Sequence, residues 1–365
     1  MARAHAPISS VRARAYRIPT DAPEADGTLE WDATTMVVVH VEAAGATGLG
    51  YTYADAAAAG IVRGTLAPIL AGEDAFAIAG LWDAMRRQVR NMGEPGIAAC
   101  AISAVDVALW DLKARLLDIP LHRLFGARRA RVPIYGSGGF LSYDDDRLAA
   151  QLAGWVEREG CARVKMKIGA DPARERARMR VARAAICDGA ALMIDANGAL
   201  EPRRALAIAA IADGEGVDWF EEPVTSDDPE GLALVRAQAP GAVEIAAGEY
   251  GYNPHAFRRL LETRAVDVLQ IDATRALGIT GFLAAAELAA AFAIPVSAHT
   301  APALHGAPAA AAANLRHVEW FHDHARIEAM LLDGAPVPTG GAIAPNEAPG
   351  HGLTFKEKEA ERYAT

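Results

Sequence analysis

The chain has few cysteines and few aromatic residues. Its three cysteines, Cys100, Cys161 and Cys187, are too few and too scattered among 365 residues for a disulfide framework or a CxxC-type metal site. We expect them to be small core residues in a protein of a reducing compartment. Basic residues near the N-terminus precede no continuous apolar stretch, which argues against a secretory signal. The sequence therefore predicts a cytoplasmic protein.

Long apolar runs and positive charge are also scarce. The longest apolar region, residues 281–313, contains Glu287, Pro295 and His299, which argues against a membrane span. Lys and Arg number 36 against 46 Asp and Glu, and no basic stripe of the kind that binds phosphate backbones is present. We therefore expect neither a membrane nor a nucleic acid as partner. Apolar residues, 52% of the chain, suffice for one large domain or two.

The first third has a mixed α+β pattern. The stretches "VRARAYRIP" and "TTMVVVHVEAAGATGLGYTY" alternate in polarity, which predicts antiparallel strands. Helical patterns follow at about 57–70 and 75–90, and then over "GIAACAISAVDVALWDLKARLLDIP". We place a first domain at residues 1–130.

From residue 131 the pattern changes to eight short apolar runs separated by alanine- and leucine-rich helical stretches. Strands that alternate with helices predict a parallel sheet, and eight of them close most naturally into a barrel over residues 131–330. The pattern alone also allows an open, doubly wound sheet. The runs are "VPIYG", "RVKMKIG", "ALMIDANG", "VDWFEEP", "VEIAAGE", "AVDVLQID", "IPVSAH" and "HVEWF".

Seven consecutive runs carry an ionisable residue at or near the carboxyl end, and this favours the barrel. Barrel active sites lie at the carboxyl ends of the strands, whereas an open sheet collects such groups from fewer strands. The gaps of 28, 26, 28, 23, 27 and 20 residues correspond to one strand–helix unit per step. The residues are Lys167, Asp195, Glu221, Glu249, Asp272, His299 and Glu319.

Three of these strand ends are carboxylates: Asp195, Glu221 and Glu249. For any one of them alone, the simplest interpretation is a polar residue at a strand end with its own hydrogen-bond partners. Three on successive strands would lie within reach of one cation. An all-oxygen ligand set suits Mg²⁺. We therefore expect one Mg²⁺ per subunit.

Two lysines, Lys165 and Lys167, share one face of the strand before Asp195. They would be solvated on an edge strand, but a central parallel strand has no solvated face, so both should point at the metal site. Each opposes protonation of the other, and desolvation and a metal act in the same direction. We expect one of them to be neutral often enough to act as a base.

Across the barrel, a carboxylate hydrogen-bonded to one nitrogen of His299 would fix its tautomer and raise the basicity of the other nitrogen. Asp272 ends the preceding strand and can supply this carboxylate. Glu319 either forms a salt bridge at the rim or, if the site keeps it protonated, donates a hydrogen bond to a substrate oxygen.

At these residues the chain resembles the enolase superfamily, and within it the mandelate racemase subgroup. The resemblance implies a modified (β/α)7β barrel, an α+β capping domain to which residues 331–365 return, a small-molecule carboxylate substrate and a homo-oligomer. The matching motifs are "KMK" (165–167), "DANG" (195–198), "EEP" (221–223), "GE" (248–249), "QID" (270–272), "SAH" (297–299) and "VEW" (318–320).

The resemblance also implies roles. Asp195, Glu221 and Glu249 would bind Mg²⁺, Lys167 would be the base on one face of the substrate, and the pair of His299 and Asp272 would serve the other face. Lys165 would assist Lys167 and contact the substrate carboxylate, which Glu319 would hydrogen-bond opposite the metal. Asn197 and Glu222 match positions near the metal and the substrate.

The shared first step is abstraction of the proton alpha to a carboxylate through a metal-stabilised enediolate. Reprotonation from the other face makes a racemase or epimerase, and loss of a β-hydroxyl makes a dehydratase. By analogy with the subgroup we favour dehydration of an aldonate or aldarate to a 2-keto-3-deoxy acid. A non-catalytic metal-binding oligomer is the third alternative.

Substrate choice is expected to lie in loops of the capping domain, around residues 20–32, where Glu24, Asp26 and Thr28 are candidates to bind sugar hydroxyls. One departure from the subgroup is "GEYGY", where asparagine often follows the metal-binding glutamate. His322 and His324 have an HxH spacing that can bind zinc, but we expect them to line the pocket instead.

Overall fold

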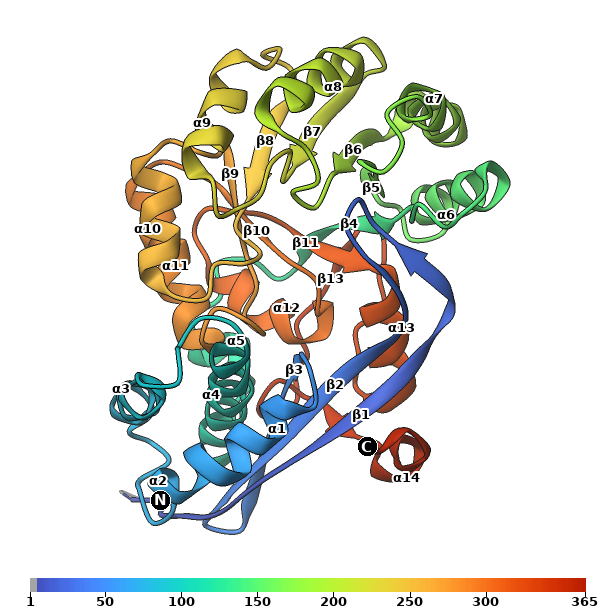
Figure 1. Cartoon of the computed structure of the whole chain (residues 1–365). Coiled ribbons are helices and arrows are strands. Elements are labelled where there is room, and N and C mark those ends of the chain that lie inside the picture. Colours follow the sequence, from blue (N-terminus) through green and yellow to red (C-terminus); the bar gives the residue numbers. More distant parts are fainter. Residues whose placement is uncertain (1–4) are drawn as a thin grey trace.

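The computed structural model describes residues 5–365, apart from the side chain of Cys187. Residues 1–4, the start of the first expected domain, lie outside the described part. The barrel occupies one end of the molecule, and an antiparallel sheet with its helices lies against the barrel mouth (Figure 1). Cys100 and Cys161 are buried free thiols, as expected, whereas the Cys187 side chain lies outside the described residues.

Eight parallel strands form the barrel in sequential order, and the eighth pairs with the first. This closure excludes the open sheet, and all eight predicted strands are present. The strands are β4 (Val132–Gly138), β5 (Arg163–Lys167), β6 (Ala191–Asp195), β7 (Val217–Glu221), β8 (Glu244–Ala247), β9 (Val268–Ile271), β10 (Val296–Ala298) and β11 (Leu315–Phe321).

A helix follows each of the first seven barrel strands, so the expected (β/α)7β arrangement is confirmed. Helix α13 (His322–Leu331) follows the eighth strand and leads to the C-terminal segment. The helices between the strands are α6 (Asp145–Glu157), α7 (Glu175–Ile186) with a short 3-10 turn after it (Cys187–Gly189), α8 (Pro202–Gly214), α9 (Pro229–Gln238), α10 (Pro254–Glu262), α11 (Gly278–Ala291) and α12 (Pro302–Ala311).

The cap consists of a three-stranded antiparallel sheet and the helices that pack on it. The strands are β1 (Ile8–Ala25), β2 (Glu30–Ala43) and β3 (Ala46–Tyr53). The helical segments are α1 (Ala57–Ile61), a π-helical turn (Val62–Leu66), α2 (Ala67–Leu70), α3 (Ile78–Val89), α4 (Ile97–Leu116) and α5 (Leu121–Leu124).

Two glycines in β3 explain how closely α4 approaches the sheet. A Cβ at Gly48 or at Gly50 would lie 2.1 Å from the carbonyl oxygens of Ala108 and Ala104, respectively. Both glycines lie on one face of the strand, because alternate residues share a face. Only a residue without a side chain permits this contact, so the sequence of β3 sets the position of the buried helix.

The segment expected to be a substrate loop, residues 20–32, is mostly strand. Strands β1 and β2 extend through it as a long hairpin whose tip is a tight turn at Asp26. The Asp26 carboxylate accepts the backbone N–H groups of Thr28 and Leu29, at 2.6 and 2.8 Å. A side chain that closes its own turn in this way replaces a flexible loop by an ordered one.

The C-terminal segment contacts both the cap and the barrel. Arg14 of β1 pairs with Glu361 at 2.9 Å, and the Thr365 N–H donates to the Ala15 carbonyl at 3.1 Å. The strand β13 pairs with β4 of the barrel, which we did not anticipate. The segment contains β12 (Leu332–Asp333), β13 (Ala342–Ile343), β14 (Thr354–Phe355), α14 (Glu357–Ala360) and a 3-10 turn (Glu361–Tyr363).

The barrel core follows the alternation predicted for β5. Val164, Met166 and Ile168 are fully buried toward the surrounding helices, while the two lysines lie on the other face, inside the barrel. Across residues 5–365 we find no helix that combines the length and the apolar character of a bilayer span.

Candidate functional site

The three predicted metal ligands come together at the carboxyl ends of β6, β7 and β8. Asp195 lies in register with Glu221 on the next strand, and Glu249 follows β8 after Gly248. All three are buried, and they offer oxygen atoms that lie within 4.8 Å of one another. Three carboxylate oxygens at this spacing form a site for one divalent cation, and the all-oxygen donor set fits Mg²⁺.

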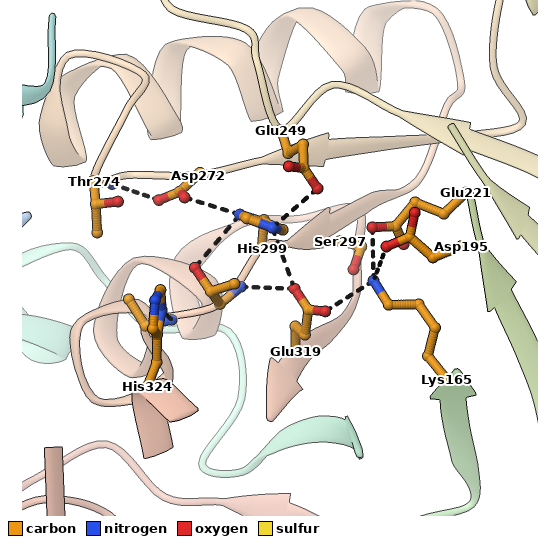
Figure 2. A network of polar contacts seen from close by, with 12 residues as sticks. Lys165, Asp195, Glu221, Glu249, Asp272, Thr274, Ser297, His299, Glu319 and His324 are labelled. Atoms are coloured by element: carbon orange, nitrogen blue, oxygen red, sulfur yellow. Dashed lines mark hydrogen bonds and ion pairs between the residues drawn. The ribbon is translucent and has the colours of Figure 1, made fainter. Parts of the chain in front are cut away.

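Lys165 and Lys167 point into this cluster from β5, as expected. The Lys165 ammonium donates to Glu221 at 2.6 Å and lies 2.8 Å from Glu319 (Figure 2). The Lys167 ammonium donates to Asp195 at 2.6 Å, and these two residues are neighbours in the β5–β6 register. Both side chains are almost completely buried.

The nearby carboxylates oppose the loss of a proton that we expected of one lysine beside a bound metal, and that expectation stays a prediction. Burial acts most strongly, to lower the pKa of Lys167, but the negative charges of Asp195, Glu249 and Glu221 together outweigh burial and the nearby Lys165, so the pKa is raised. The pKa of Lys165 is likewise raised, by Glu221 and Glu319 against burial. When no cation neutralises the carboxylates, their negative charge is what raises the pKa of both lysines. The sequence showed two adjacent ammonium groups but not the distances to their partners.

His299 and Asp272 form the expected pair. The Nδ1 atom of His299 lies 2.9 Å from Asp272, whose other oxygen accepts the Thr274 N–H at 2.7 Å. The Nε2 atom lies 3.0 Å from Glu249 (Figure 2). Burial opposes ionisation, but Glu249 and Glu319 raise the pKa of His299 to about 10. Strand β10 is separated from β5 by β4 and β11, so histidine and lysines approach from different sides of the barrel.

Glu319 is an acceptor in this structure, not the protonated donor that we considered. It lies 2.8 Å from the Lys165 ammonium and accepts the Thr300 N–H at 3.0 Å. Burial acts to raise its pKa, but Lys165 and His299 lower it to about 2. Thr300 donates from a left-handed backbone conformation, with φ of 51°, which is uncommon for a β-branched residue. The backbone after His299 is therefore shaped to hold Glu319.

A cavity of about 210 Å³ opens above these groups, between the barrel mouth and the tip of the β1–β2 hairpin. Barrel and cap both contribute to its wall. It is lined by Asp26, Leu29, Trp31, Thr34, Lys167, Asn197, Glu249, Tyr250, Arg275, His299, Thr300, Glu319, Phe321 and His324.

Sequence reasoning missed Arg275, which is part of this wall. Its guanidinium is 3.1 Å from Glu249 and 3.6 Å from Asp272, and it lies over the ring of Tyr250 at 5.0 Å. Tyr250 is the residue at which the sequence departs from the subgroup, and it supplies an aromatic wall there. The available signal was position, because Arg275 follows Asp272 by three residues at the same strand end.

The expected substrate-binding residues have different surroundings. Asn197 lines the cavity, with its N–H 2.9 Å from Asp195. Glu222 does not line it, and accepts the Ser226 hydroxyl at 2.5 Å. Asp26 lines the cavity, but one of its oxygens is engaged in the hairpin turn that includes Thr28.

Glu24 is not a cavity residue, and this expectation was wrong. It is fully buried and accepts the indole N–H of Trp31 at 2.8 Å. Burial raises its pKa to about 8. Because Trp31 does line the cavity, Glu24 supports the wall from behind instead of contacting what enters.

The side chains of the two histidines in the HxH motif lie in different places, which argues against a shared zinc ion. His322 pairs with Asp21 of the hairpin at 3.1 Å, whereas His324 lines the cavity as expected. Residues two apart on a helix point in nearly opposite directions, because a helix turns by about 100° for each residue.

A closed barrel with carboxylates, lysines and a histidine–aspartate pair at its mouth, covered by an α+β cap, defines a class of barrel proteins that can hold a divalent cation between groups able to transfer protons. The chain belongs to the enolase superfamily. Residues 147–359 match the enolase C-terminal domain-like family, and residues 14–126 match the N-terminal domain of the mandelate racemase / muconate lactonizing enzyme family.

Known relatives share the whole length of the chain. A 3,6-anhydro-alpha-L-galactonate cycloisomerase of Streptomyces coelicolor is 32% identical, over 98% of this chain and 99% of the relative. The structure of a mandelate racemase/muconate lactonizing enzyme-like protein from Rubrobacter xylanophilus is 46% identical, with a TM-score of 0.96 over 98% of this chain and 100% of that one.

A third relative was solved with ligands. The L-talarate dehydratase of Polaromonas sp. JS666, complexed with Mg and L-glucarate, is 31% identical, with a TM-score of 0.88 over 99% of this chain and 98% of that one. Two of these three relatives are named as enzymes of sugar acids. The family and fold expected from the sequence are confirmed.

Proposed function

We propose that the chain is a Mg²⁺-dependent dehydratase of an aldonate or aldarate. The observation that carries the proposal is the arrangement of the site: three carboxylates lie close enough to hold one cation, and Lys167 and the His299–Asp272 pair approach them from different sides of the barrel. Similarity to a talarate dehydratase that binds Mg and L-glucarate supports the choice of substrate class.

In this proposal Lys167 removes the proton alpha to the substrate carboxylate. A bound Mg²⁺ would offset the carboxylate charge that raises the pKa of Lys167, and would stabilise the negative charge that develops on the substrate carboxylate. Lys165 holds that carboxylate in place, and Glu319 in turn holds the Lys165 ammonium. Because Lys165 is already bonded to Glu221 and Glu319, it stays charged and positions the substrate, which leaves the base role to Lys167.

His299 completes the elimination. It donates a proton to the β-hydroxyl, which leaves as water while the Cα–Cβ double bond forms, and the enol then becomes a 2-keto-3-deoxy acid. Asp272 keeps Nδ1 of the ring engaged, so that Nε2 faces the reaction.

A second candidate is favoured by the cycloisomerase relative. If the β-oxygen of the substrate belongs to a ring, the same elimination opens the ring, and the product is an isomer of the substrate. Similarity over 98% of the chain to an anhydro-galactonate cycloisomerase supports this possibility. A racemase or epimerase, which returns the proton to the opposite face, is the runner-up from the sequence.

One screen separates these reactions. Aldonic, aldaric and anhydro-aldonic acids are incubated with the Mg²⁺-loaded protein in deuterated water, and products are detected with semicarbazide and by mass. A dehydratase product is lighter than its substrate by one water, a cycloisomerase product keeps the substrate's composition, and a racemase returns substrate labelled at Cα.

Absence of every product and of exchange, with Mg²⁺ only raising the melting temperature, would establish the third alternative, a non-catalytic metal-binding protein. Loss of the wild-type product in His299→Asn is expected for the dehydratase and contradicts that alternative. A homo-oligomer and a cytoplasmic location stay predictions.

A further inference from the structure

His324 lines the cavity but has no part in the chemistry proposed above. It lies near the start of α13 and shares the cavity wall with Lys167 and His299. Figure 2 shows it on the side of His299 and Glu319 that is remote from Lys165 and the carboxylates of Asp195 and Glu221. A molecule whose carboxylate lies at the cation site would therefore extend toward His324.

The imidazole ring of His324 is held in one orientation. Its face stacks on Tyr53, with ring centroids 3.5 Å apart and planes inclined by 14°. Its edge meets Phe321 at 5.1 Å and 82°. Two aromatic contacts at right angles leave the ring little freedom to turn, so little entropy is lost when it binds a ligand.

The backbone determines which ring nitrogen carries the proton. The Ala301 N–H donates to Nδ1 at 3.4 Å, so Nδ1 is the acceptor and we assign the proton of the neutral ring to Nε2. Burial lowers the pKa of His324 to about 3, against a raising effect of Asp272. Among the described residues Nε2 has no hydrogen-bond partner, and it is not closed off from the cavity.

We propose that His324 binds the end of the substrate remote from the cation site, by donating a hydrogen bond from Nε2 to a hydroxyl or carboxylate oxygen. The identity of this ligand as a polyhydroxy acid rests on the proposed function. A fixed donor selects for an oxygen at that place, because a ligand with an apolar remote end would leave Nε2–H without a partner.

Two amide variants form a matched pair for the test. In His324→Gln the amide N–H₂ reaches about as far as Nε2 and keeps a donor, whereas in His324→Asn the shorter side chain keeps an acceptor for Ala301 but loses the remote donor. The dissociation constants of galactarate and of glycolate, which lacks a remote end, are measured by calorimetry with Mg²⁺ present for wild type and both variants.

We expect His324→Asn to raise the dissociation constant of galactarate about tenfold and His324→Gln to raise it less than about threefold, as one neutral hydrogen bond implies. The glycolate constant should change less than about twofold in both. Equal galactarate binding by wild type and His324→Asn overturns the inference, as does equal weakening of both ligands. Wild-type protein that binds galactarate no more tightly than glycolate also overturns it.

The same measurements distinguish this inference from the proposed function. If galactarate binds as expected but no acid is converted, the reaction proposed above fails while the role of His324 stands. If acids are converted but His324→Asn binds galactarate like wild type, the dehydratase stands and the role of His324 fails.

Discussion

At the scale of residues, the site consists of cationic side chains that lie among buried carboxylates. Removing one member of a buried ion pair costs more than the pair contributes, because the remaining charge is left without a partner. The carboxylates are Asp195, Glu221, Glu222, Glu249, Asp272 and Glu319, and the cationic side chains among them are Lys165, Lys167, Arg275 and His299.

Lys167→Met tests the base. We expect kcat for the wild-type substrate to fall by at least about 10²- to 10⁴-fold, or roughly 3 to 5 kcal/mol of barrier, because a positioned proton acceptor is lost. Steady-state kinetics at saturating Mg²⁺ measure this. Lys356→Met, far from the site beside Asp333, is the control and should retain full activity. A loss below tenfold in Lys167→Met would assign the proton transfer to another group.

Glu328 should make stability depend on pH. It is buried, accepts the Tyr51 hydroxyl at 2.7 Å and the Ala303 N–H at 2.9 Å, and burial raises its pKa to about 8. The folded state therefore binds a proton that the unfolded chain releases near its ordinary pKa of 4.5. This contribution to stability is complete below about pH 4.5 and is lost as the pH rises through 8.

Glu328→Gln keeps the shape and removes the titration. Between pH 5 and 8 the melting temperature of wild type should fall relative to that of the variant, at roughly 2 °C for each kcal/mol. Thermal unfolding at several pH values, with the difference between the two proteins taken at each, isolates the effect. A difference that stays constant across this range would show that Glu328 is ionised in the folded protein.

At the scale of elements, the β1–β2 hairpin closes the site. Its tip is held to the barrel by Leu141, whose N–H donates to the Ala25 carbonyl at 2.8 Å, and by Ser142, whose hydroxyl donates to the Pro23 carbonyl at 2.6 Å. Short contacts of this kind set the height of the cavity.

Gly27→Ala should lift the tip of the hairpin. An added Cβ would lie 2.7 Å from the Ala196 carbonyl oxygen and 2.8 Å from that of Ile168, so the backbone must move. We expect KM to rise severalfold while the affinity for Mg²⁺, measured by calorimetry, stays unchanged.

Gly60→Ala is the matched control, because Gly60 is exposed on α1 with open space around it. That change should leave KM unaltered and stabilise the helix by about 0.5–1 kcal/mol. Equal KM values for the two variants would mean that the tip position does not matter for binding.

At the scale of the whole molecule, the cap is anchored to the barrel through α4 and the start of α11. Asp106 accepts the Thr280 N–H at 2.9 Å and its hydroxyl at 2.6 Å. The indole N–H of Trp110 donates to the same hydroxyl at 2.9 Å, and Ser103 accepts the Gly278 N–H at 2.9 Å. These bonds hold the two parts in one arrangement.

Asp106→Ala should weaken this junction. It leaves the N–H and the hydroxyl of Thr280 without their acceptor, which costs about 1–3 kcal/mol for a buried group. The melting temperature should drop by several degrees, measured by calorimetry. Asp83→Ala, on the exposed face of α3, is the control and should change it little. Equal melting temperatures in the two variants would contradict the anchoring role.

Much of the fold and of the site was predictable because their signals are local. The alternation in "RVKMKIG" shows that both lysines share a face. Asp195 and Glu221 end their strands and Glu249 follows its strand by two residues, so position along the chain predicts position at the barrel mouth. Arg275 was missed because it ends no apolar run, and the loop after a strand has no periodicity that aims its side chains.

The sequence by itself determined the family, the eight strands and the residues at their ends, because periodicity and spacing are properties of neighbouring residues. Only the tertiary structure decided which carboxylates contact the two lysines, the burial of Glu24 behind Trp31 and the tautomer of His324. Those depend on distances between groups far apart in the chain. Electrostatic and hydrogen-bond energies change steeply with such distances, and no local pattern records them.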